Sequence, residues 1–107
     1  MSREYLGEFE HILLLAVLHL EPEAHGARIR RGIRERTGRS ASLGAIYSTL
    51  RRLAEKGYVT TVEVPSPRGG RPRRLSRVTG PGLRALQRSR AVLEAMAEGL
   101  EGRLADG

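Results

Sequence analysis

The stretch that decides the fold is SLGAIYSTLRRLAEKGYV, residues 42–59. Its apolar residues recur at intervals of three and four, the spacing of one face of a helix: Leu43, Ile46, Leu50 and Leu53. Ser40 or Ser42 suits the N-cap of this helix, and Gly57 suits its C-cap. We therefore predict a helix over residues 42–56.

The face opposite this stripe carries unusually small side chains. Ser48 lies almost diametrically opposite the stripe, with Gly44 and Ala45 on the preceding turn and Arg51 and Arg52 on the next. Small side chains let a helix lie deep in a DNA major groove, and its N-terminal amides favour phosphate. The alternative is an indifferent solvent-facing surface. However, a glycine in a helix costs about 1 kcal/mol against alanine, which favours the DNA-facing interpretation.

Tyr47 lies on the boundary between the two faces. Its ring can pack against the domain while its hydroxyl reaches a phosphate. A purely structural tyrosine is an equally good interpretation at this point.

Two further helices precede this stretch. Residues 2–20 are apolar almost all round, which predicts a helix covered on more than one side, and Pro22 ends it. Residues 27–37 form a second, arginine-rich helix that ends before Gly38. Together with the helix over 42–56, they predict a helix-turn-helix arrangement.

A β-hairpin follows the third helix. YVTTVEV (residues 58–64) and LSRVT (residues 75–79) alternate as strands do, and PSPRGGRPRR joins them. Five arginines occupy half of the positions from 68 to 77: Arg68, Arg71, Arg73, Arg74 and Arg77. Cations without interleaved acids repel one another, so an anionic partner is a better interpretation than a solvated charge run. Such a loop, here residues 65–74, can follow a phosphate strand or enter a narrow minor groove.

The last predicted helix runs from about Pro81 towards Arg103. Leu86, Leu93 and Leu100 repeat every seven residues along it. This seam suggests a partner helix, although packing against the first helix is the alternative. The residues we expect at a dimer contact are Phe9, Leu13, Leu86, Leu93, Met96 and Leu100.

The expected architecture is mainly α with a small β-hairpin: a winged helix-turn-helix domain over residues 1–80, with residues 2–20 also contributing to the dimer, and a C-terminal dimerisation helix over residues 81–107. The predicted DNA-contacting residues are Ser40, Ser42, Gly44, Ala45, Tyr47, Ser48, Arg51, Arg52, Arg68, Arg71, Arg73 and Arg74.

Composition supports a nucleic-acid partner. The 107-residue chain carries a formal net charge of +7, which points to nucleic acid first and to an anionic membrane second. It has no cysteine, and its longest apolar run, residues 12–18, is far shorter than the roughly 20 residues of a membrane span. We expect a cytoplasmic protein with no membrane association.

Catalysis has little support in the sequence. There are three histidines, and Asp106 is the single aspartate. No Ser-His-Asp set, paired-carboxylate cleft or histidine metal pair can be drawn from these residues. We therefore expect no enzymatic activity, catalytic residue, metal or cofactor.

Three segments resemble the PadR family of winged-helix transcriptional regulators. They are HG at residues 25–26, SLGAIYSTLRRLAEKGYV, and GGRPRRLSRVTGPG at residues 69–82. Ala27 stands where the family usually has tyrosine, and Leu75 and Ser76 replace an aromatic pair. The resemblance implies a homodimer that binds double-stranded DNA at a pseudo-palindromic operator, usually as a repressor. A small-molecule effector is a family possibility that the sequence does not identify.

Two other functions remain open from the sequence. One is a non-specific basic nucleic-acid-binding module, and the other is a winged helix that binds an acidic protein. The first predicts tolerance of DNA sequence and no need for a dimer, and the second predicts a monomer that ignores DNA.

Overall fold

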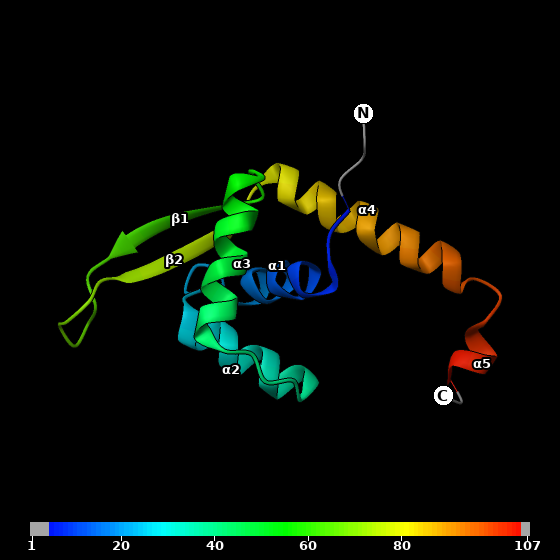
Figure 1. The fold of residues 1–107 in the computed structure, drawn as a ribbon, viewed down its shortest axis with the longest axis horizontal. Helices are drawn as coiled ribbons and strands as arrows, with labels where there is room; N and C mark the ends of the chain where they lie inside the picture. The colour runs from blue at the N-terminus through cyan, green and yellow to red at the C-terminus, as the bar shows by residue number, and fades with distance from the viewer. Residues whose placement is uncertain (1–4, 106–107) are drawn as a thin grey trace.

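The computed structural model describes residues 5–105, in which helices predominate and two strands form a hairpin (Figure 1). In chain order the elements are α1 (Glu8–Leu20), α2 (Gly26–Thr37), α3 (Leu43–Glu55), β1 (Val59–Val64), β2 (Arg73–Val78), α4 (Gly80–Ala97) and α5 (Glu101–Ala105). The predicted class, a winged helix-turn-helix with a C-terminal helix, is confirmed. The hairpin and the second half of α4 extend in opposite directions from the packed helices.

The core forms around α1, which packs against α2, α3, β2 and the start of α4. Its buried apolar residues are Leu13, Leu14, Val17, Ile29, Ile33, Ile46, Leu50, Leu53, Val59 and Leu86. Ile46 and Leu53 are fully buried, so the predicted stripe of α3 does face the core. Because burying such a side chain contributes about 1.5–3 kcal/mol, this stripe fixes which face of α3 remains outside.

The two ends of α3 are set by local chemistry. The Ser42 hydroxyl accepts a hydrogen bond of 3.0 Å from the amide of Ala45, which selects Ser42 rather than Ser40 as the N-cap. Gly57 follows the helix with a φ of 81°, and the Tyr58 amide then donates to the Leu53 carbonyl at 2.8 Å. A left-handed glycine with this returning bond is a common helix end. It turns the chain directly into β1.

The hairpin is antiparallel, with register from Val59 opposite Val78 to Val64 opposite Arg73. The returning strand thus begins at Arg73, two residues earlier than the predicted residue 75, because Arg73 and Arg74 pair with β1. The outer edge of β2 is tied to the domain, since the Ser76 amide donates to the Ala24 carbonyl at 2.9 Å. These bonds hold the base of the hairpin beside α1.

The start of α4 is clamped to the end of α3. The Thr79 hydroxyl donates to the Gly57 carbonyl at 2.6 Å and accepts from the Gly82 amide at 3.0 Å. A Cβ on Gly82 would lie 2.8 Å from Cγ1 of Val78 and closer still to the carbonyl oxygen of Tyr58. Only glycine permits this approach of helix to backbone.

The two terminal helices differ from the prediction. The first begins at Glu8 rather than residue 2; residues 1–4 of that prediction lie outside the described part of the chain. The last does not run on to Arg103, because α4 ends at Ala97 and Gly99 takes a φ of 87°. A left-handed residue breaks the helix. Leu100 therefore lies beyond the break, and the predicted seven-residue seam does not follow one continuous helix.

Candidate nucleic-acid interface

The outer face of α3 is open and carries small side chains over its first two turns. Gly44, Ala45 and Ser48 are all exposed, and Arg51 and Arg52 follow them on the next turn. Ser40 and Ser42, also exposed, precede the helix. A Cβ built on Gly44 would meet only the Ser42 hydroxyl oxygen, at 3.9 Å, so packing within the chain does not require this glycine. The sequence correctly separated the two faces of α3.

Tyr47 packs on the first residue of α2. A Cβ on Gly26 would lie 2.7 Å from Cζ and 2.8 Å from Cε1 of the Tyr47 ring, so the ring occupies the space that a side chain at Gly26 would need. Tyr47 nevertheless remains 43% exposed. The ring therefore has a structural role, joining two of the sequence motifs, while a phosphate contact by its hydroxyl stays a prediction.

A basic cleft separates α3 from the hairpin. It has a volume of about 480 Å³, and Tyr47 and Arg51 line it from α3. The residues that line its other sides are His25, Ala27, Glu63, Arg71, Pro72, Arg73 and Arg74. Glu63 is the acidic member, and Arg74 neutralises it at 3.5 Å between Nε and Oε2. The remaining charge of the cleft is positive, which suits a phosphate backbone.

His25 lies on the same side of the domain as this cleft. Burial lowers the pKa of His25, and the positive charges of Arg73, Arg28 and, less strongly, Arg31 lower it further, against the opposing charge of Glu23. The imidazole is thus surrounded mainly by cations. This side of the domain is prepared for an anion.

The predicted hairpin arginines fall into two groups. Arg68 and Arg71 lie on the exposed loop between the strands, where Gly69 and Gly70 have φ values of 75° and 83°. Arg73 and Arg74 belong instead to β2, and both line the cleft together with Arg71. The predicted loop over residues 65–74 was therefore wrong for its last two residues, which belong to β2.

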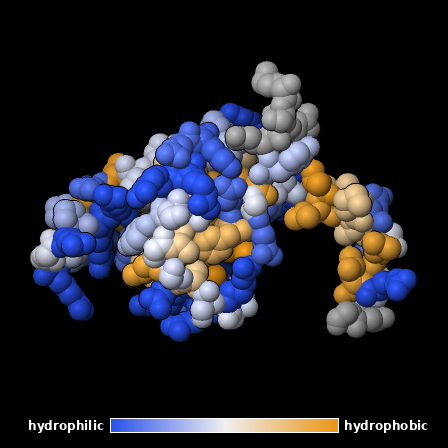
Figure 2. Space-filling model, viewed as in Figure 1, coloured by the Kyte–Doolittle hydropathy of each residue, from blue (hydrophilic) through white to orange (hydrophobic). Residues whose placement is uncertain are grey.

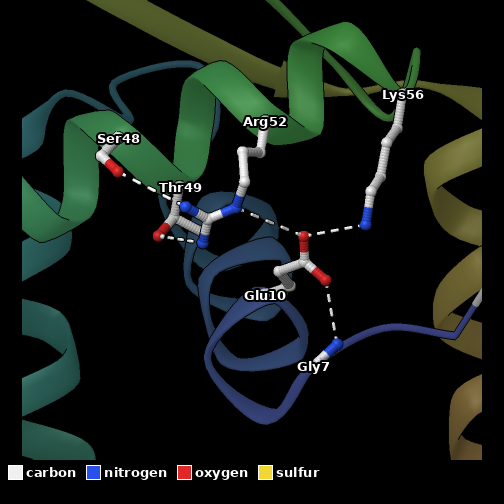
Figure 3. A network of polar contacts seen from close by, with 6 residues as sticks. All are labelled: Gly7, Glu10, Ser48, Thr49, Arg52 and Lys56. Carbon is white, nitrogen blue, oxygen red and sulfur yellow. Dashed lines mark hydrogen bonds and ion pairs between the residues drawn. The ribbon is translucent and has the colours of Figure 1, made fainter.

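A polar network below α3 distinguishes Arg52 from Arg51 (Figure 3). Glu10, on α1, is only 8% exposed. Its Oε2 lies 3.0 Å from Nζ of Lys56 and 4.0 Å from Nε of Arg52, and its Oε1 accepts from the Gly7 amide at 2.9 Å. Burial raises the pKa of Glu10, but the Gly7 hydrogen bond and the charges of Lys56 and Arg52 outweigh it and hold this pKa below its usual value.

Sequence reasoning missed Glu10 and Lys56, which are 46 residues apart in the chain. A signal for Glu10 was present, because it shares the buried face of α1 with Leu13, Leu14 and Val17 at spacings of three, four and seven. An acid on an apolar stripe needs a partner. Nothing local in the sequence identifies that partner as Lys56.

The predicted dimer residues are divided by burial. Leu13 is 0% and Leu86 is 4% exposed within the single chain, so both belong to the core, and Phe9 is half-buried against it. Leu93 and Met96 are 62% and 74% exposed, and Leu100 is exposed after the break. Figure 2 shows apolar surface over the projecting half of α4 and over α5. The candidate contact surface thus consists of the later residues alone.

Residues 5–105 contain neither a candidate metal site nor a membrane-spanning helix. In this part of the chain, no group of three or more His, Asp or Glu side chains is placed to hold a metal ion. Nor does any helix there have both the length and the apolar character that crossing a bilayer requires.

Comparison with known proteins places the chain. The winged-helix arrangement is shared with a transcriptional regulator from Thermoplasma acidophilum, at 22% identity and a TM-score of 0.71 over 92% of this chain and 97% of the other. A PadR family regulator from Eggerthella lenta matches at 22% identity and 0.71, over 91% and 86% of the two chains. A winged-helix DNA-binding protein from STIV matches at 17% and 0.68, over 90% and 98%.

At these identities the solved structures establish the fold alone. No curated protein matches the chain significantly. The sequence model of the transcriptional regulator PadR-like family matches residues 14–88, well over half of the chain, and spans α2, α3 and the whole hairpin. The protein is therefore a member of the PadR-like family, a winged-helix, DNA-binding transcriptional regulator.

Proposed function

We propose that the protein is a homodimeric repressor that binds a pseudo-palindromic operator, with α3 in the major groove and the hairpin loop on the flanking backbone. The observation that carries this proposal is the juxtaposition of a small-residue helix face with an arginine-lined cleft. One surface admits a groove, and the other attracts the phosphates that border it.

The exposed residues of α3 support a contact with the major groove. Gly44, Ala45 and Ser48 leave the backbone free to approach base edges, and Arg51 stands one turn further along the same face. Few of these side chains can read bases directly. We therefore propose that DNA shape and the spacing of two half-sites supply much of the specificity.

The arginines of the hairpin support a contact with the DNA backbone. Arg68 and Arg71 project on the loop, and Arg73 and Arg74 line the cleft beside α3. A groove-bound α3 would bring the phosphates on either side within reach of these two pairs. Such contacts position a protein on the duplex without selecting sequence.

The dimer is argued from the projecting half of α4. Val92, Leu93 and Met96 are 49%, 62% and 74% exposed, a concentration of apolar surface that water solvates poorly. We propose that the terminal helices of a second copy cover these residues. Two-fold symmetry would then present two α3 helices to two half-sites.

The test is a titration of the DNA upstream of the protein's own gene against a scrambled duplex of equal length, across a salt series. We expect tighter binding to the upstream DNA at every salt concentration and a dimeric mass by sedimentation. Equal affinities throughout would reject the operator, and a monomer on DNA would reject the paired half-sites. Repression is tested separately, by a reporter whose expression should rise when the protein is removed.

A further inference from the structure

The neighbouring arginines Arg51 and Arg52 have different surroundings. Arg51 lines the basic cleft, and no hydrogen bond or ion pair within residues 5–105 restrains its guanidinium. Arg52 lies back along α3, where Nη1 donates to the Ser48 hydroxyl at 3.4 Å and Nη2 donates to the Thr49 hydroxyl at 3.2 Å (Figure 3). These bonds hold the group against its own helix.

The charge that attracts Arg52 comes from another helix. Nε of Arg52 lies 4.0 Å from Oε2 of Glu10, which projects from the first turn of α1. This carboxylate cannot follow Arg52 towards solvent, because the Gly7 amide holds its first oxygen and Lys56 holds its second. Glu10 therefore acts as a fixed anion beneath the DNA-facing helix.

We propose that Glu10 is a positioning residue that restrains Arg52 and so keeps it from serving as a free phosphate-binding cation. The inference rests on the proposed operator function. An unrestrained arginine on the exposed side of α3 would contact phosphates of any duplex and add a sequence-independent term to binding. By restraining Arg52, Glu10 increases the discrimination between operator and other DNA.

The size of the effect follows from the geometry. The Arg52 side chain is 54% exposed and its ion pair is long, so the restraint is modest. Releasing Arg52 should raise the affinity for a scrambled duplex by about 3- to 10-fold and steepen the dependence of log affinity on log salt by about 0.9, one phosphate contact. Affinity for the operator should rise less, because its contacts are already positioned, so the ratio of the two affinities falls.

The direct test is Glu10→Gln, measured on scrambled and upstream duplexes across a salt series. Glutamine keeps one oxygen, which can accept from the Gly7 amide, while the contact with Lys56 and the negative charge are lost. The matched control is Glu55→Gln, which makes the same change of charge on α3 itself, at an exposed residue outside this network. Only Glu10→Gln should steepen the salt dependence beyond what the added net charge produces.

An Arg52→Ala background identifies the released group. If Arg52 is responsible, adding Glu10→Gln to Arg52→Ala raises the affinity for scrambled DNA by no more than adding Glu55→Gln does. If a larger rise persists in that background, Lys56 is responsible and the proposal is overturned.

A second pair of variants keeps the proposal testable if Glu10→Gln fails to fold. Arg51→Ala should weaken binding to scrambled DNA, whereas Arg52→Ala should leave it within about 2-fold of the wild type. Equal losses in the two variants would overturn the proposal. Because these measurements use scrambled DNA, they remain decisive even if the upstream DNA proves not to be an operator, and that failure would appear separately in the wild-type protein.

Discussion

The outer face of α3 and the projecting half of α4 are both exposed, yet they expose opposite kinds of residue. On α3 the open positions carry glycine, alanine and serine, followed by arginines. On α4 they carry Val92, Leu93 and Met96. The core covers one side of α3, whereas residues 90–96 of α4 are all exposed.

The difference indicates two kinds of partner. A small, polar face beside cations suits a hydrated and charged surface that must approach the helix backbone, as a DNA groove does. Large apolar side chains suit a dry contact with another protein surface. The small, polar face thus belongs to a helix within the packed part of the chain, and the large apolar side chains belong to the half of α4 that projects away from it (Figure 1).

The largest loss of operator affinity is expected when exposed apolar side chains of α4 are replaced by charged ones. The double substitution Leu93→Glu with Met96→Glu places two charges on the proposed helix contact and should convert the dimer into a monomer. Operator affinity should then fall by about 100-fold or more, because the second half-site no longer binds within the same particle. Sedimentation and DNA titration measure the two outcomes.

The matched control for this variant is Arg88→Glu, which adds charge on another exposed position of α4. It should leave the mass of the particle unchanged. Circular dichroism should show intact helices in both proteins, because Leu93 and Met96 contribute nothing to the core of a single chain. If the double variant stays dimeric, these residues of α4 do not form the dimer contact.

The second-largest loss of operator affinity is expected when a large side chain is placed on the face of α3 that carries small residues. Gly44→Leu meets open space within the chain, and leucine is a better helix former than glycine, so the free energy of unfolding should rise by about 0.5–1 kcal/mol. The same side chain would stand between the helix and the groove. Operator affinity should fall by about 10-fold, equivalent to about 1.4 kcal/mol.

A substitution at Gly44 should therefore raise the free energy of unfolding and lower the operator affinity. Gly44→Ala should show the same stabilisation with a smaller loss of affinity. Gly82→Ala serves as the contrasting glycine, since its Cβ would meet the backbone of Tyr58 and must destabilise the fold. If Gly44→Leu binds the operator as well as the wild type does, this half of α3 does not enter a groove.

Much of this contrast could be predicted from the sequence, because it depends on local pattern. The spacing of three and four that begins at Leu43 fixed the inner face of α3, and therefore the outer one. The hydroxyl caps at Ser42 and Thr79 are local signals as well. The pattern could not decide between two conflicting signals near Gly99. The leucine spacing favoured a continuous helix, whereas the glycine favoured a helix end, and the helix does end there.

The contacts that the sequence left open or missed involve residues brought together only by the fold. The pairing of Glu10 with Lys56 and the packing of Tyr47 on Gly26 both join helices whose relative placement no single segment encodes. Arg73 and Arg74 were assigned to the loop because proline and glycine surround them, and cross-strand pairing drew them into β2 instead. Leu13 and Leu86 were predicted as dimer-contact residues because burial within one chain and burial in a dimer leave the same apolar pattern in the sequence.

A smaller loss of DNA affinity is expected in the hairpin loop, whose arginines add to the positive charge beside α3. Arg71→Ala should weaken binding to operator and scrambled duplexes alike, by roughly 3-fold, and should reduce the salt slope by about one. Arg103→Ala on α5 removes the same charge far along the chain and should change the slope less. A selective loss on the operator would instead mean that Arg71 reads sequence, for example within a narrow minor groove.

The smallest effect on operator affinity is expected at Ser42, the N-cap of α3. Its hydroxyl oxygen already accepts from the Ala45 amide, so Ser42→Ala should lower the free energy of unfolding by about 1 kcal/mol, and Ser42→Gly by only a few tenths. Operator affinity should stay within about 2-fold of the wild type. Ser40→Ala is the control, since Ser40 caps no helix and should change neither quantity.

The hydroxyl hydrogen is the part of the Ser42 side chain that capping leaves free to donate to a phosphate. Urea unfolding and DNA titration on the same variants separate these two roles. A loss of operator affinity in Ser42→Ala that Ser42→Gly reproduces in full, despite its smaller loss of stability, would show that this hydrogen binds DNA. The cap and the DNA contact would then belong to one side chain, and the bare start of α3 would take part in recognition through its first residue.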